Sequence, residues 1–122
     1  MADTLNMDVS DDLFKAMIGL SSLSGGCGGI CGATAAISLR YGVPREDFKK
    51  DSERSGQVYT KIINTVKIVR NKMSEKYGGY LCSDIQGKLF GRSYDIIVPE
   101  EREDFSNEPI YEECPQVTED AA

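Results

Sequence analysis

Hydrophobic and polar positions follow the period of an α-helix most clearly between residues 56 and 79. The apolar side chains there form one stripe with two flanking tyrosines and an isoleucine: Val58, Ile62, Val66, Val69 and Met73, flanked by Tyr59, Ile63 and Tyr77. This spacing predicts a long amphipathic helix that buries one face against the rest of the protein. Gly78 and Gly79 follow directly and predict the end of that helix.

Two shorter helices are predicted closer to the N-terminus. Ser10 precedes two aspartates, which is typical of an N-cap, and residues 11–20 carry apolar side chains at helical spacing. Four glycines then predict a loop: Gly25, Gly26, Gly28 and Gly29. A second helix is expected over residues 30–41, with Gly42 and Pro44 beyond its end. The small residues of this helix allow another backbone or a cofactor to approach closely: Ala33, Ala35, Ala36 and Ser38.

The rest of the chain gives weaker signals. Ser83 is expected to cap a short helix over residues 84–90, and residues 93–101 are expected to hold one short extended piece. Nothing else resembles a strand, and there are no repeats. We therefore expect an all-α fold: a helical cysteine-motif domain over residues 1–98, with a glycine-rich cysteine loop, and an irregular acidic C-terminal arm over residues 99–122.

Composition narrows the class of protein. A chain of 122 residues is long enough for one compact domain, and its net charge of −6 argues against nucleic acid as the main partner. No apolar run approaches the roughly 20 residues that a membrane span needs. The acidic N-terminus has no apolar signal core, so we expect a cytoplasmic location.

The charge is unevenly distributed along the chain. Residues 99–122 hold nine acidic residues and one basic residue, whereas residues 1–98 hold eleven and thirteen. The acidic segment is interpreted either as a solvated tail or as an arm that wraps something. Four basic residues fall on one stripe of the long helix, which forms either a solvated face or a docking face for an acidic surface: Arg54, Lys61, Lys72 and Lys76.

Histidine is absent, while four cysteines are present: Cys27, Cys31, Cys82 and Cys114. The absence of histidine excludes Ser/His/Asp and Cys/His nucleophilic machinery, histidine-ligated haem and Cys₂His₂ zinc sites. An intracellular chain does not normally use its cysteines in structural disulfides. The cysteines are therefore the main candidates for chemistry.

The pair Cys27 and Cys31 lies among glycines at the start of a predicted helix. On a regular helix their Cβ atoms would be ~5–6 Å apart, whereas a disulfide needs ~3.5–4.5 Å. Thiolates that share a metal centre tolerate the wider spacing, since each contributes a bond of ~2.3 Å. Backbone N–H groups of four glycines can form an anion-binding nest around such a centre: Gly26, Gly28, Gly29 and Gly32. The alternative is a tight turn with two small core cysteines.

Cys82 follows a Gly-Gly pair, and Cys114 precedes Pro115, as at some ferredoxin cluster ligands. Taken singly, each of these cysteines is interpreted as a small buried side chain. Taken together with the other pair, they favour one shared four-cysteine metal site. Four thiolates suit an iron–sulfur cluster, with [4Fe–4S] favoured and [2Fe–2S] as the alternative.

The stretch CGATAAISLRYG at residues 31–42 resembles the redox-active protein family named for its pattern C_GCAxxG_C_C. The resemblance extends to LFKAMIGLSSLSGGCGGICGA, KYGGYLCSDIQG and EECPQV, and so covers most of the chain. It implies that Cys27 precedes the motif, Cys31 belongs to it, and the other two cysteines follow it. Ala36 stands where the family motif ends in glycine. A related module in split-Soret cytochrome c looks like an iron–sulfur site, which supports a cluster here.

The function expected from these observations is electron transfer, or redox or oxygen sensing, by an iron–sulfur module rather than by a catalyst. Such a small module needs a partner, so we expect a monomer or homodimer that docks onto a larger anaerobic redox or methyl-transfer enzyme. A thiol/disulfide oxidoreductase is the first alternative, although the chain lacks a C-x-x-C pair and a βαβ pattern. A structural Cys₄ zinc adaptor is the second, although only one cysteine knuckle is present. An adaptor without metal is the third.

Overall fold

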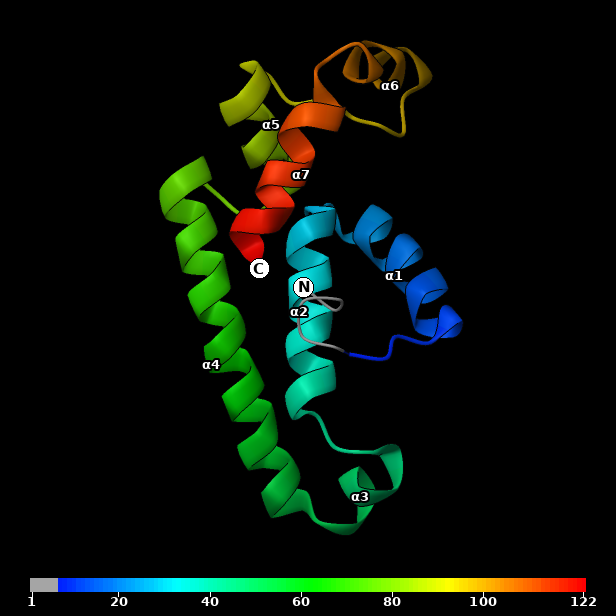
Figure 1. Ribbon diagram of the computed structural model, residues 1–122, viewed down its shortest axis with the longest axis vertical. Helices are drawn as coiled ribbons and strands as arrows, with labels where there is room; N and C mark the ends of the chain where they lie inside the picture. Colours follow the sequence, from blue (N-terminus) through cyan, green and yellow to red (C-terminus); the bar gives the residue numbers. More distant parts are fainter. Residues whose placement is uncertain (1–6) are drawn as a thin grey trace.

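The computed structural model describes residues 7–122, with residues 21–24 described by their backbone alone (Figure 1). In this part of the chain the secondary structure consists of seven helices, with no strand: α1 (Asp11–Ser24), α2 (Gly28–Tyr41), α3 (Arg45–Lys50), α4 (Ser52–Tyr77), α5 (Cys82–Phe90), α6 (Pro99–Ser106) and α7 (Ile110–Ala121). The prediction of an all-α fold is confirmed.

The helix boundaries follow from local capping. At the start of α1 the hydroxyl of Ser10 accepts a hydrogen bond from the Leu13 N–H at 3.3 Å, as its N-cap position predicts. The helix runs four residues further than predicted and ends where Gly25 takes a left-handed φ of 65°. Asp51 caps α4 by accepting from the Arg54 N–H at 2.9 Å. That helix ends at Gly78, whose φ of 81° favours glycine.

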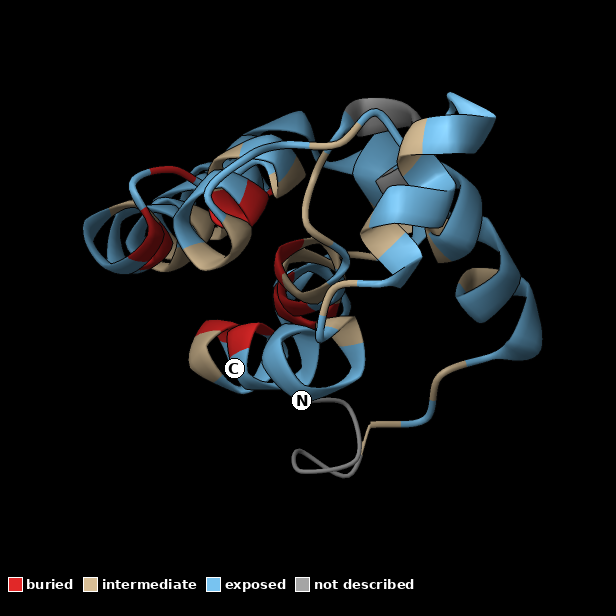
Figure 2. Cartoon of the chain, turned by 90° about the horizontal axis from the view of Figure 1, so that it is seen from above, coloured by how far each residue is buried: buried red, intermediate tan, exposed pale blue. Residues whose placement is uncertain are grey.

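Four helices contribute side chains to the core: α2, α4, α5 and α7. Figure 1 shows α2 and α4 running antiparallel, with α3 joining their lower ends, α1 on the other side of α2, and α7 beside the upper parts of both. Figure 2 shows that the buried positions are few and gather on the sides of helices that face other helices. Met73 and Val117 are the most deeply buried large side chains, each with 1% exposure. The other core members are Ile30, Ala33, Tyr77, Ile85 and Ala121. The predicted apolar stripe of α4 therefore packs inward at its C-terminal end.

The expectation of an irregular arm over residues 99–122 is wrong, because this segment forms α6 and α7. Val117 and Ala121 lie four residues apart on one face of α7 and enter the core, so the segment carries an apolar stripe among its acidic residues. The expected extended piece over residues 93–101 is wrong too. No strand in the described part of the chain could pair with it, its last residues start α6, and Ile97 is 80% exposed.

Polar contacts connect the C-terminal end of α7 to the C-terminal end of α4. The ammonium of Lys76 and the hydroxyl of Tyr77 both donate hydrogen bonds to one carboxylate oxygen of Asp120. These two bonds, that from Lys76 first, hold the pKa of Asp120 below its ordinary value. Burial, together with the bond to Asp120, raises the pKa of Tyr77. The ionised carboxylate therefore stabilises the packing of α7.

Replacing Asp120→Asn should lower the free energy of unfolding near neutral pH by about 1 kcal/mol, because two hydrogen bonds lose their charged acceptor. The pKa of Asp120 in the folded state lies below its ordinary value of 3.8, so this stability is present above that value. It is lost as the pH falls through the lower, folded value. Urea unfolding across this range should show wild type and variant converging below about pH 4.

The matched control is Asp12→Asn, since the Asp12 carboxylate pairs with Lys15 at 3.7 Å but its side chain is 97% exposed. It should change stability little at any pH. A constant difference between wild type and the Asp120→Asn variant over the whole pH range would contradict a stabilising role for the ionised carboxylate.

Candidate four-cysteine site

Backbone pairing brings the starts of α2 and α5 together. The Cys82 N–H donates to the Gly25 carbonyl at 2.9 Å, and Gly26 forms an isolated antiparallel bridge with Leu81. The two-glycine turn after α4 makes this possible, because a Cβ at Gly79 would lie only 2.0 Å from the Asp84 carboxylate. The glycine loop before α2 and the first residue of α5 are therefore direct neighbours.

Cys27 and Cys31 occupy the first turn of α2. Cys27 is the N-cap residue, and its carbonyl accepts from the Cys31 N–H at 2.9 Å. No side chain caps this end of the helix. Gly28 and Gly29 belong to the helix rather than to the loop predicted for them. The positive end of the α2 helix dipole therefore lies next to Cys27 and Cys31.

Cys82 is the first residue of α5, on the opposite side of the backbone bridge. Leu81 is the N-cap, and its N–H donates to the Asp84 carboxylate at 3.1 Å. The prediction that Ser83 caps this helix is therefore wrong, since Ser83 lies inside its first turn. The side-chain amide of Gln86, one turn later, donates to the Cys82 sulfur at 3.3 Å. A helix N-terminus and an amide donor thus surround this thiol.

Cys114 comes from α7 and is the most exposed of the four cysteines. One turn further along, the Thr118 hydroxyl donates to the Cys114 carbonyl at 3.1 Å. Thr118 lies directly against α2, because a Cβ built on Gly29 would come within 2.8 Å of its hydroxyl oxygen and 2.9 Å of its Cα. Gly29 therefore determines how closely α7 approaches α2, and so where Cys114 lies.

Replacing Gly29→Ala should destabilise the fold by about 1–3 kcal/mol, because the added methyl meets the backbone of Thr118 and α7 must shift. Gly32→Ala is the matched control on the same helix, since its Cβ would meet nothing within 4 Å. Alanine favours a helix interior, so the control should be neutral or slightly stabilising. Urea unfolding measures both variants, and equal stabilities would contradict the close contact between α2 and α7.

The thiols are electrostatically coupled, and none of the four forms a disulfide. Burial, and then the neighbouring Cys27, raises the pKa of Cys82; Cys114 and Cys31 act in the same direction, and the Gln86 hydrogen bond opposes them. Although Cys114 is exposed as a residue, partial burial of its sulfur and the charge of Cys27 raise its pKa too. Negative charge on one thiol therefore disfavours it on the next.

Within residues 7–122, no three cysteine, aspartate or glutamate side chains are grouped closely enough to hold a metal ion. The cysteines lie near enough to influence one another's charge, but they are not closed around a common point. The chemistry of the set fits an iron–sulfur cluster: four thiols with no other ligand type, two helix N-termini, and mutual repulsion between thiolates that a shared cationic centre relieves.

The glycines predicted to bind a cofactor have different surroundings. Gly26 takes part in the bridge to Leu81, and Gly29 contacts Thr118. A Cβ at Gly28 or Gly32 would meet nothing, and both residues line an apolar groove of about 330 Å³ between α1 and α2. Cys31 forms part of the same wall. The bare backbone therefore leaves this cysteine open to small molecules on the α1 side.

Two residues next to the cysteines were not found from the sequence. Gln86 stands four residues after Cys82, and Thr118 stands four residues after Cys114. Each spacing places the two residues one above the other on a helix. The spacing of Gln86 from Cys82 was enough to suggest an amide donor for that thiol. The contact of Thr118 with α2 could be found only from the three-dimensional structure.

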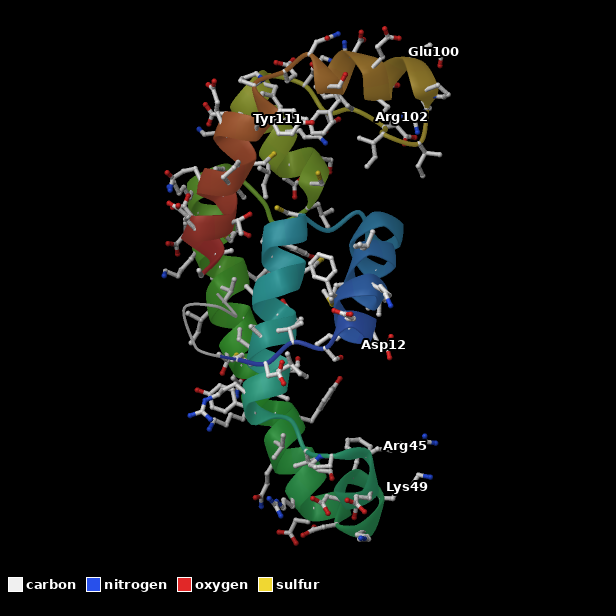
Figure 3. The ribbon with its side chains drawn as sticks, turned by 45° about the vertical axis from the view of Figure 1, so that its right-hand side comes forward. Asp12, Arg45, Lys49, Glu100, Arg102 and Tyr111 are labelled. Atoms are coloured by element: carbon white, nitrogen blue, oxygen red, sulfur yellow. The ribbon has the colours of Figure 1, made fainter. Side chains whose placement is uncertain are left out.

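The basic stripe predicted on α4 is exposed along its length, and two of its members have partners. Lys61 lies over the Tyr41 ring at 4.0 Å, and Lys76 bonds to Asp120. Figure 3 shows Glu100 on α6 at one end of the molecule, with Arg45 and Lys49 around α3 at the other. No helix in the described residues has the length and apolar character to cross a membrane.

Comparison with known proteins shows that the chain matches one protein family. A family model described as "Putative redox-active protein (C_GCAxxG_C_C)" matches residues 1–122, which is the whole chain. No curated protein and no solved structure matches the chain significantly.

Proposed function

Because the chain belongs to the redox-active family C_GCAxxG_C_C over its whole length, we propose that it is a small iron–sulfur protein. The proposed ligands are Cys27, Cys31, Cys82 and Cys114. The observation that carries this proposal is the backbone bridge between residues 25–26 and 81–82, which brings together cysteines that are more than fifty residues apart in sequence.

The surroundings of the thiols support such a centre. Two helix N-termini lie in this region, and the first-turn N–H groups of Gly28 and Gly29 have no acceptor inside α2, so they are available to an anionic cluster. Gly32 lies beyond this first turn, and Gly26 takes part in the bridge to Leu81. The four sulfurs must move closer together when a cluster assembles, because they are not grouped for a metal ion as they stand. A [4Fe–4S] cluster uses all four thiolates, and [2Fe–2S] is the alternative.

The proposed role is electron transfer or redox sensing, including oxygen sensing, rather than catalysis of a reaction on a bound substrate. When bound, the cluster supplies one-electron chemistry. The chain itself leaves three of the cysteines half-buried, and Cys31 borders an open groove, so small oxidants can reach this region. The exposed basic stripe of α4 and the acidic segment from Glu100 to Asp120 offer two surfaces on which a larger redox enzyme can dock.

A redox titration tests this role. Protein prepared without oxygen should absorb visible light, lose part of this absorbance on addition of dithionite, and regain it with a mild oxidant. Air should degrade the absorbance within hours, because the region is open to solvent. The proposal fails if the protein has no visible absorbance that responds to a reductant.

The partner is tested by affinity purification from native extract, performed both without oxygen and after exposure to air. We expect a specific larger protein that is recovered under only one of the two conditions. Cys114→Ser should remove this difference, because the fourth ligand links the cluster to α7. The same proteins under every condition would contradict a redox-controlled accessory subunit.

A further inference from the structure

Gln86 is a polar side chain with only 3% exposure, buried at the junction between the cysteines and the loop that follows α5. A buried amide without partners costs several kcal/mol, so the partners of this side chain define what it does. One partner is the sulfur of Cys82, one helical turn earlier. The other lies in the loop that leads to α6.

The two contacts fix the orientation of the amide. The Tyr94 N–H can only donate, and it lies 2.7 Å from the Gln86 carbonyl oxygen. The NH₂ group must therefore face the Cys82 sulfur, at 3.3 Å. The Tyr94 side chain is held in turn by a ring contact with Phe105 at 5.6 Å between centroids and by a hydrogen bond that its hydroxyl donates to Glu108. The loop therefore fixes the orientation of the Gln86 amide, and the amide donates a hydrogen bond to the Cys82 sulfur.

We propose that Gln86 is a positioning residue that controls how electron-rich the Cys82 sulfur is. An N–H group directed at a sulfur stabilises additional negative charge on it. Hydrogen bonds to ligand sulfurs are among the factors that determine the reduction potential of an iron–sulfur cluster. Gln86 therefore raises the reduction potential of a cluster bound through Cys82, a consequence that rests on the proposed function.

The test compares reduction potentials of the cluster-loaded chain by anaerobic redox titration. Gln86→Met keeps the volume of the side chain but removes its donor, so the potential should shift to more negative values. Tyr94→Phe keeps the backbone N–H but removes the bond to Glu108, so it loosens the loop while leaving the amide in place. Gln57→Met makes the same chemical change at an exposed position on α4. Both controls should retain the wild-type potential.

Two results would overturn the inference. One is a wild-type potential in the Gln86→Met variant. The other is an equal shift in the Gln86→Met and Tyr94→Phe variants, because a role confined to supporting the loop predicts that outcome. A negative shift in Gln86→Met alone supports direct action on the sulfur.

A wild-type chain that takes up no iron would contradict the proposed function, and the contact with Cys82 would then be judged in the metal-free protein. A double-mutant cycle between Gln86→Met and Cys82→Ala should show coupling of about threefold to tenfold in the unfolding equilibrium constant. The cycle with Cys31→Ala should be additive, since Gln86 does not bond to that sulfur. Additive effects in the Cys82 cycle would overturn the inference.

Discussion

Replacing either Cys31→Ser or Cys82→Ser is expected to remove most of the iron from anaerobically prepared protein. The two cysteines come from α2 and α5, the helices whose starts are joined by the backbone bridge. Losing either one leaves three thiols where the proposed cluster uses four. A serine hydroxyl is a poor substitute, because the soft thiolate is what an iron–sulfur cluster requires. Iron analysis per folded chain measures the effect.

Ser83→Ala is the matched control, since it changes the residue next to Cys82 without removing a thiol or the cap of α5. This control should load iron as wild type does. Urea unfolding of the metal-free variants should show that both serine replacements fold, so that lost iron reports lost ligands. Full iron occupancy in both the Cys31→Ser and the Cys82→Ser variants would contradict the proposed ligand set.

The second large effect concerns α7. The first half of this helix makes few contacts, because Tyr111 is 87% exposed and Pro115 supplies no N–H to the turn before it. The second half is held by Val117 in the core and by Asp120 on α4. A cluster that binds Cys114 would restrain the first half of α7. Amide hydrogen exchange over residues 110–114 should slow by at least about tenfold on cluster loading, which corresponds to about 1.4 kcal/mol.

Cys114→Ser provides the comparison for this prediction. The variant should keep the packing of Val117 and Asp120, but its exchange over residues 110–114 should be the same with and without cluster. An equal slowing in wild type and in the Cys114→Ser variant would show that Cys114 does not connect the cluster to α7. The proposed link between redox state and the shape of the acidic segment would then be lost.

The long helix α4 was predictable because its apolar stripe, its polar face and its terminal glycines all agree. The start of α1 was predictable for the same reason, since Ser10 and two aspartates mark it. The end of α2 was predictable too, but its start was placed at residue 30, so Cys27 was assigned to the loop instead of the N-cap. In these segments local sequence determines local structure, and tertiary contacts only reinforce it.

Other parts depended on contacts that no local pattern reveals. The stripe of Val117 and Ala121 in α7 is short, interrupted by Pro115 and hidden among acidic residues, so the segment resembled a solvated tail. The β-branched residues over 96–98 favoured a strand, but the described part of the chain offers no partner strand. The close contact between α7 and Gly29 could not be predicted, because Gly29 and Thr118 are nearly ninety residues apart in sequence.

The central claim is that the four cysteines share one iron–sulfur cluster. The most direct measurement is the content of iron, acid-labile sulfide and zinc per chain in anaerobically purified wild-type protein, recorded together with its absorption spectrum. The account predicts about four iron and four sulfide per chain for [4Fe–4S], or about two of each for [2Fe–2S], with broad visible absorbance. Stoichiometric zinc without sulfide, or a colourless protein without metal, would contradict it.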